Sequence, residues 1–140
     1  MNDFRVLFVD DEADFLDTIL KRMQKRGVAA FGARSGEQAL VWLQQQTADI
    51  VVLDVRMQGI DGIQTLRAVK STHPLIEVIM LTGHASLEIA REGMQLGAFD
   101  YLMKPVDLDE LLYKLEDAYK KKTLQQQKIN TIEEVIESRK

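Results

Sequence analysis

Four short apolar runs, each ending in a polar functional group, constrain the fold of this chain more than any other feature. They are residues 6–9, 50–53, 78–81 and 101–103, which run into Asp10-Asp11, Asp54, Thr82 and Lys104-Pro105. Runs of this length are typical of buried strands. If the strands are parallel neighbours, their carboxyl ends meet at one edge of a sheet, where open α/β sheets bind ligands. The sequence therefore predicts a crevice that gathers three carboxylates, a hydroxyl and an ammonium group.

Helix-like segments alternate with the strand-like runs along most of the chain. We expect strands at 5–9, 28–33, 50–53, 77–81 and 101–103, with a helix after each. Gly27 and Gly97 are expected to end two of these helices, and Ser35 is expected to cap another with Gln38 as its partner. Five rounds of strand and helix predict an α/β fold whose parallel sheet carries helices on both faces.

Composition limits the classes of protein that remain. The 140 residues favour one main domain, and the absence of Cys excludes disulfides and thiolate chemistry. A net charge of −4 argues against nucleic-acid binding through bulk charge. No apolar run approaches the roughly 18 residues of a membrane span, and no signal peptide is visible. We therefore expect a cytoplasmic protein that binds neither nucleic acid nor membrane directly.

The C-terminal stretch differs from the rest in its periodicity. Apolar and polar residues alternate there at spacings of three and four, as in a coiled-coil heptad, at Leu108, Leu111, Leu115, Ala118, Lys122, Gln125, Ile129, Ile132 and Ile136. We expect one long helix that outgrows its domain; a frayed, solvated tail is the alternative. The chain then divides into a domain over 1–122 and a helical extension over 123–140, which could be a coiled coil or a linker.

The grouped side chains suit a divalent cation and a phosphoryl group. Mg²⁺ prefers carboxylate oxygens, and a cation would relieve the repulsion among Asp10, Asp11 and Asp54. Asp54 follows the most apolar strand and is the best candidate for a carboxylate that attacks phosphorus. Lys104 and Thr82 could then contact the phosphoryl oxygens. Taken alone, the acidic run could instead begin a helix, and Thr82 could cap one.

These residues, in this order on five strand–helix units, strongly resemble the receiver domain of two-component response regulators. The resemblance covers about residues 3–122 and includes two further motifs, Met57…Asp61-Gly62 and Tyr101…Lys104-Pro105. It implies a flavodoxin-like, doubly wound (βα)5 fold with strand order 2-1-3-4-5 and a CheY-like site. Gln58 stands where many relatives have Pro, which could loosen that loop but removes no chemistry.

The resemblance implies a role for each site residue. Asp54 would accept the phosphoryl group; Asp11 and Asp54 would bind Mg²⁺ directly, Asp10 through a water, and Arg56 through its backbone carbonyl. Thr82 and Lys104 would contact the phosphoryl group, and the Lys104-Pro105 bond would be cis. Thr82 and Tyr101 would form a switch pair, while Arg56 and His84 would tune the lifetime of the phosphoryl group.

The predicted function is a phosphorylation-dependent switch in a two-component phosphorelay. A sensor histidine kinase or phosphotransfer protein would supply the phosphoryl group, and a downstream protein would bind the face around the fifth strand. We expect no turnover of a separate substrate. A Mg²⁺-dependent phosphatase is disfavoured because Arg56 stands where its second acid would be needed.

Four alternatives to a self-contained monomeric switch must be weighed. A nucleotide-binding enzyme is even less favoured than the phosphatase, because the sequence has neither a G-x-G-x-x-G nor a Walker A motif. A module that is never phosphorylated is opposed by the retention of all five site residues. The chain could be the receiver fragment of a longer transcriptional regulator, and the last helix could form a homodimer.

Overall fold

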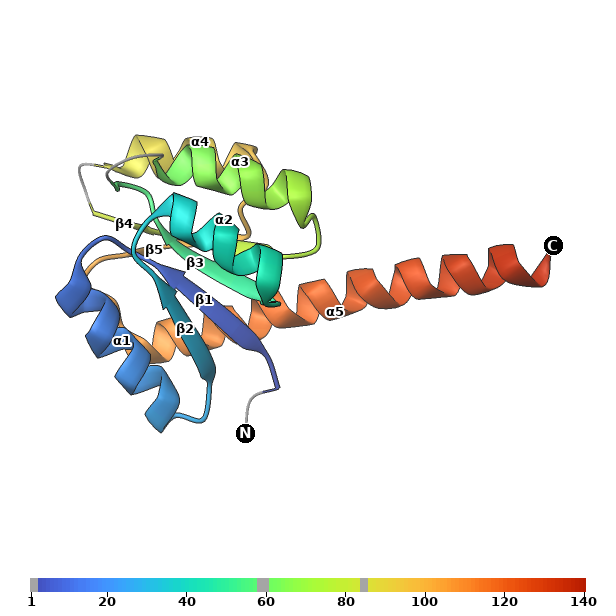
Figure 1. The fold of residues 1–140 in the computed structure, drawn as a ribbon, viewed down its shortest axis with the longest axis horizontal. Coiled ribbons are helices and arrows are strands. Elements are labelled where there is room, and N and C mark those ends of the chain that lie inside the picture. Colours follow the sequence, from blue (N-terminus) through green and yellow to red (C-terminus); the bar gives the residue numbers. More distant parts are fainter. Residues whose placement is uncertain (1–2, 58–60, 84–85) are drawn as a thin grey trace.

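The computed structural model describes residues 3–57, 61–83 and 86–140 and consists of one parallel sheet between two layers of helices (Figure 1). The strands are β1 (Arg5–Val9), β2 (Ala29–Ala33), β3 (Ile50–Asp54), β4 (Glu77–Thr82) and β5 (Asp100–Met103). They pair in the order β2-β1-β3-β4-β5, every pair parallel. The predicted doubly wound (βα)5 fold is therefore confirmed.

The helices divide between the two faces of the sheet. They are α1 (Ala13–Lys25), α2 (Gly36–Gln45), α3 (Gly62–Thr72), α4 (Leu87–Gln95) and α5 (Leu108–Ser138). Figure 1 shows α1 and α5 on one face and α2, α3 and α4 on the other. Two buried apolar clusters correspond to these layers, and every residue of β3 and β4 is buried. Strands covered on both faces are apolar along most of their length.

Most of the predicted helix ends are observed. Gly27 and Gly97 adopt positive φ angles of 76° and 105°, the conformation that favours glycine. The Ser35 hydroxyl accepts a hydrogen bond from the Gln38 N–H, at 3.1 Å. The predicted capping box is wrong in one detail, because the Gln38 side chain accepts from the Arg34 N–H instead of the Ser35 N–H.

Helix α5 is continuous over 31 residues and is therefore about 46 Å long. Leu111, Leu115 and Ala118 bury its first turns against the sheet. Side chains from 127 onward are exposed, and this part of the helix projects away from the domain (Figure 1). The predicted long helix is confirmed, and residue 122 marks a change in packing and not a break in the helix.

None of the described helices is long and apolar enough to cross a membrane.

Candidate acidic site at the carboxyl ends of the strands

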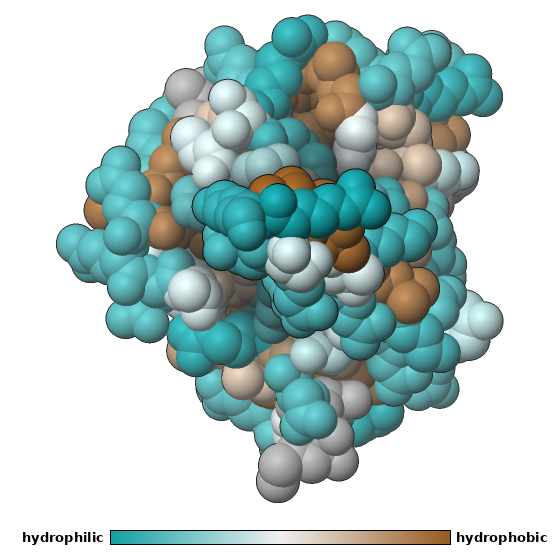
Figure 2. Space-filling view, turned by 90° about the vertical axis from the view of Figure 1, so that its right-hand side faces the viewer, coloured by the Kyte–Doolittle hydropathy of each residue, from teal (hydrophilic) through white to brown (hydrophobic). Residues whose placement is uncertain are grey.

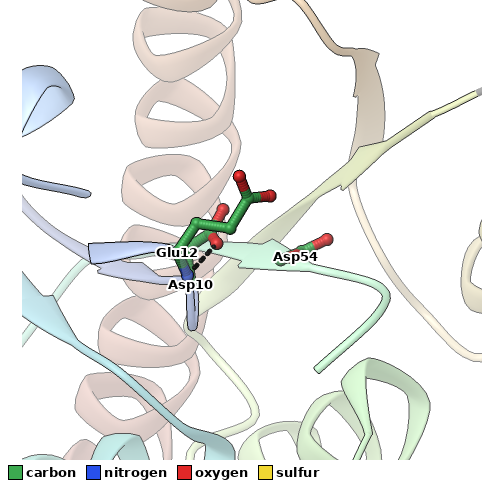
Figure 3. Close-up of side chains that lie close together, drawn as sticks. All are labelled: Asp10, Glu12 and Asp54. Carbon is green, nitrogen blue, oxygen red and sulfur yellow. Dashed lines mark hydrogen bonds between the residues drawn. The ribbon is translucent and has the colours of Figure 1, made fainter. Parts of the chain in front are cut away.

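The acidic site is built at the carboxyl ends of the central strand β3 and its neighbour β1. Asp54 is the last residue of β3, and Asp10 directly follows the neighbouring strand β1. One oxygen from each of Asp10, Glu12 and Asp54 lies within 4.8 Å of the others (Figure 3). The Asp10 carboxylate also accepts a hydrogen bond from the Glu12 N–H, at 2.9 Å, which shapes the turn after β1. Glu12 is a member of this group that sequence analysis did not identify.

The ammonium group of Lys104 lies against all three of these carboxylates. Lys104 follows β5, and its Nζ is 2.8 Å from Asp10 Oδ2, 3.3 Å from Glu12 Oε1 and 3.7 Å from Asp54 Oδ2. The same Nζ is 4.4 Å from the centre of the Phe15 ring, which covers it from the α1 side. Lys104 is thus the cation that partly neutralises the cluster. The peptide bond between Lys104 and Pro105 is cis, as predicted.

The electrostatic surroundings favour the protonated form of Asp54. Burial and the neighbouring negative charge of Asp10 raise the pKa of Asp54 from 3.8 to about 6, although Lys104 opposes this change. Burial lowers the pKa of Lys104, but its hydrogen bond to Asp10 and the charge of Asp54 more than offset this and raise it above its usual value. Lys104 therefore stays charged at neutral pH, whereas Asp54 gains or loses its proton about one pH unit below neutral.

A close backbone approach by α3 supports the end of strand β3. A Cβ on Gly62 would lie 2.6 Å from the Val55 Cα and 2.7 Å from the Asp54 carbonyl oxygen. The Gly62 N–H also donates to the Val55 carbonyl at 3.3 Å. Only glycine fits between α3 and this backbone, so Gly62 fixes the position of the chain that carries Asp54.

Thr82 and Tyr101 lie on the two neighbouring strands β4 and β5. Thr82 is fully buried, and its hydroxyl donates to the Gly83 carbonyl at 3.0 Å. Tyr101 is half-buried and packs at the edge of the cluster formed with α2, α3 and α4. The Lys114 ammonium lies 5.8 Å from the centre of the Tyr101 ring and donates to its carbonyl at 2.9 Å. Both predicted switch residues therefore lie toward the β5 edge of the sheet, which α4 and α5 flank on opposite faces.

The remaining predicted site residues lie beside the cluster. Asp11 is partly exposed, and its negative charge adds to the rise in the pKa of Asp54. The Arg56 N–H donates to Asp54 Oδ1 at 3.2 Å. The roles predicted for Gln58 and His84 lie outside the described residues.

The fold and the site together define a class of protein. Carboxylates grouped with a lysine at the carboxyl ends of parallel strands have the chemistry that suits a divalent cation and a phosphoryl group. The sequence profile of the response regulator receiver domain matches residues 6–116. The chain belongs to the response regulator receiver family.

Curated relatives and a solved structure agree with this assignment. The transcriptional regulatory protein ZraR of Escherichia coli is 40% identical over 113 residues, which are 81% of this chain and 26% of ZraR. The DNA-binding transcriptional regulator NtrC of Salmonella typhimurium is 35% identical over 125 residues, 89% of this chain and 27% of NtrC. The receiver domain of NtrX from Brucella abortus superposes with a TM-score of 0.78 at 32% identity, covering 82% of this chain and 98% of that one.

The chain thus spans about a quarter of the length of these curated relatives. It corresponds to their receiver domain, which is a phosphorylation switch. Domains of this family typically bind Mg²⁺, and they interact with histidine kinases or other phosphodonors and with output targets.

Proposed function

We propose that Asp54 is the residue of this receiver domain that accepts the phosphoryl group. The observation that carries the proposal is its environment: Asp54 ends a fully buried strand, has a pKa of about 6, and lies within reach of Lys104 and Asp10. With this pKa, the carboxylate form exceeds the acid by about ten to one at pH 7. The nucleophilic form is therefore abundant where the domain is expected to work.

In the proposed reaction a carboxylate oxygen of Asp54 forms a bond to phosphorus. The bond between phosphorus and the donor, a histidine nitrogen or the oxygen of a small acyl phosphate, breaks at the same phosphorus. The donor leaves with the electron pair of that bond. Such transfer depends mainly on positioning and on neutralising negative charge.

The donor set of the site fits Mg²⁺. Asp10 and Asp54 present grouped carboxylate oxygens, and Asp11 and the Arg56 carbonyl are the further ligands that the family resemblance implies. When bound, Mg²⁺ would supply positive charge against the phosphoryl oxygens. Glu12 belongs to the same acidic group, so we expect it to compete for Lys104 and to add to the attraction for the cation.

Lys104 and Thr82 are proposed to respond to the phosphoryl group. In the unphosphorylated site, Lys104 contacts three carboxylates. A phosphoryl group on Asp54 would offer its ammonium a more highly charged partner at the same end of the sheet. The Thr82 hydroxyl would have to leave the Gly83 carbonyl to reach a phosphoryl oxygen. Tyr101, on the next strand, would then turn inward, so the signalling surface is the face of β5 with α4 and α5.

We propose that the domain catalyses only its own phosphorylation and dephosphorylation. An aspartyl-phosphate phosphatase needs a second acid two residues after its nucleophile, and this position is Arg56. Turnover of a phosphomonoester would contradict this part of the proposal. A sensor histidine kinase or phosphotransfer protein is the proposed donor, and a downstream protein, or an output domain of a longer transcriptional regulator, is the proposed recipient.

Acetyl phosphate with Mg²⁺ tests the role of Asp54. The wild-type protein is expected to gain the mass of one phosphoryl group, and to lose this gain when EDTA replaces Mg²⁺. Asp54→Asn should show no gain, whereas Asp17→Asn, an exposed position on α1, should behave like the wild type. The same phosphorylation in Asp54→Asn would refute the assignment.

We also propose that the projecting part of α5 pairs with a second copy of the chain. Its exposed apolar side chains include Ile129, Ile132 and Ile136, which follow the heptad spacing. Figure 2 views the molecule from the side to which the helix projects and shows hydrophobic surface among hydrophilic side chains there. An apolar stripe that the domain does not cover favours a partner helix with the same stripe.

Sedimentation with and without beryllofluoride tests this pairing. We expect a concentration-dependent dimer that Ile132→Glu abolishes, while Glu133→Gln, an exposed neighbour outside the apolar stripe, leaves it intact. A monomer at high concentration under both conditions would remove the dimer proposal without affecting the role of Asp54.

A further inference from the structure

Two acids at the amino ends of β3 and β4 contact α5, at the edge of the sheet opposite to the Asp54 site. Asp49 immediately precedes β3, and Glu77 is the first residue of β4. Their partners are consecutive lysines of α5: Lys122 Nζ lies 2.6 Å from Asp49 Oδ1, and Lys121 Nζ lies 3.3 Å from Glu77 Oε2. The ion pairs thus join one short stretch of helix to the starts of two strands.

The pair formed by Glu77 is not an ordinary surface ion pair. Glu77 is 0% exposed, and neither of its carboxylate oxygens has a hydrogen-bond partner among the described residues. A buried charge is costly unless another charge compensates it, and removing one partner of such a pair is strongly unfavourable. Lys121 compensates Glu77 from α5, and its chain also lies over the Phe99 ring, with Nζ 5.7 Å from the ring centre.

A second lysine, in the other helical layer, is affected by the charge of Glu77. Burial lowers the pKa of Lys70 on α3, an effect that the negative charge of Glu77 opposes and the positive charge of Lys121 strengthens. The Lys70 ammonium itself is held by the Pro74 and Ile76 carbonyls, at 2.9 Å each. Glu77 therefore interacts electrostatically with lysines of both helical layers, Lys70 of α3 and Lys121 of α5.

The pair formed by Asp49 is also well fixed. Asp49 and Lys122 have side-chain exposures of only 18% and 24%. The second carboxylate oxygen of Asp49 accepts a hydrogen bond from the Arg5 N–H, at 2.8 Å, so the acid is held by β1 while it holds Lys122. Exposed ion pairs contribute little to stability because both side chains are mobile. Asp49 and Lys122 are more firmly held because both are largely buried and Asp49 is also hydrogen-bonded to Arg5.

The direction of the projecting part of α5 depends on how the helix is held near Lys121 and Lys122. The last fully buried residue of α5 is Ala118, and residues 123–138 span about 24 Å at the rise of an α-helix. Figure 1 shows that this segment projects from the domain. A change of angle near residue 122 would therefore displace its free end by a large distance.

We propose that Asp49, Glu77, Lys121 and Lys122 form an anchor that fixes the direction in which the extension leaves the domain. The anchor belongs to the same strands as the acidic site, since β3 ends in Asp54 and β4 ends in Thr82. A shift of either strand at the site would be carried through the anchor to the extension. This last step rests on the proposed function, whereas the anchor itself does not.

Distance measurements between two spin labels test the anchor directly. The chain has no Cys, so nitroxides can be placed at Lys21→Cys on α1 and Glu133→Cys on the extension, both exposed. An excess of unlabelled protein removes distances between two copies. Measured without any phosphodonor, the distribution should have a single narrow maximum in the labelled parent and in Lys120→Met, whose exposed side chain forms no ion pair among the described residues.

The double variant Lys121→Met/Lys122→Met should lose this single maximum and show a broad distribution. A folded double variant with the narrow distribution of the parent would overturn the proposal. The double variant leaves the buried Glu77 unpaired and could fail to fold. Lys122→Met alone keeps the Lys121–Glu77 pair and provides a second, folded test. It should also broaden the distribution; if only this variant folds and its distribution stays narrow, the proposal is overturned as well. Because no phosphorylation is involved, neither result depends on the role of Asp54.

Discussion

Asp54→Asn is expected to make the metal-free domain more stable at neutral pH. The folded protein raises the pKa of Asp54 from 3.8 to about 6, mainly through burial and the charge of Asp10. A difference of about two pKa units between the unfolded and folded states corresponds to about 3 kcal/mol. Asparagine has no proton to lose in this range and does not carry this cost.

The sign of the pH dependence follows from the raised pKa. Well below pH 3.8 Asp54 is protonated in both states, and its titration has no effect on stability. Between 3.8 and about 6 the unfolded chain releases the proton while the folded protein retains it, so the stability of the wild type falls as the pH rises. About one pH unit above the folded-state pKa of about 6, the loss is complete. Lys104 stays charged throughout this range and adds no slope of its own.

Urea unfolding of both proteins between pH 4 and pH 7.5, in EDTA, measures this effect. The difference in unfolding free energy, Asp54→Asn minus wild type, should grow by about 2.4 kcal/mol from pH 4 to pH 7.5, because a small part of the effect has already developed at pH 4. A constant offset from altered hydrogen bonding does not affect this growth. Asp17→Asn serves as the exposed control and should follow the wild type. A difference that stays flat across the range would refute the reasoning from burial and charge.

Four further predictions follow from the packing and charges. Gly62→Ala should destabilise the domain by about 1–3 kcal/mol in urea unfolding, because its Cβ would meet the backbone at Val55. Leu115→Ala should cost about 2–5 kcal/mol, since this fully buried side chain fills the contact between α5 and the sheet. Lys104→Met should raise the pKa of Asp54 further, as followed by carboxyl carbon NMR, because Lys104 now lowers it. Mg²⁺ should raise the urea midpoint of the wild type more than that of Asp54→Asn.

The position of the acidic site could be predicted from sequence because it depends on strand ends alone. Asp10, Asp54, Thr82 and Lys104 each follow or end an apolar run, and parallel pairing brings such ends to one edge. The membership of Glu12 could not be predicted in this way. It depends on the turn after β1 and on the reach of Lys104, which lies 92 residues further along the chain.

The contacts of α5 show the same limit of sequence patterns. Its length could be predicted from the periodicity and the lack of Gly and Pro after Pro105. The heptad pattern predicts only that Lys122 is a polar residue at a heptad position. Nothing in the neighbouring sequence indicates that Lys122 binds Asp49, which is 73 residues away. The burial of Glu77 was equally hidden, because a charged residue at a strand start is usually exposed.

Mapping the modified residue tests whether Asp54 accepts the phosphoryl group. The protein is phosphorylated with acetyl phosphate and Mg²⁺, reduced with borohydride to convert the acyl phosphate into a stable alcohol, and digested for peptide mass spectrometry. We expect the converted residue to be Asp54 and Asp10, Asp11 and Glu12 to stay unchanged. Conversion at one of those three residues, or at none while the intact protein still gains a phosphoryl group, would contradict this expectation.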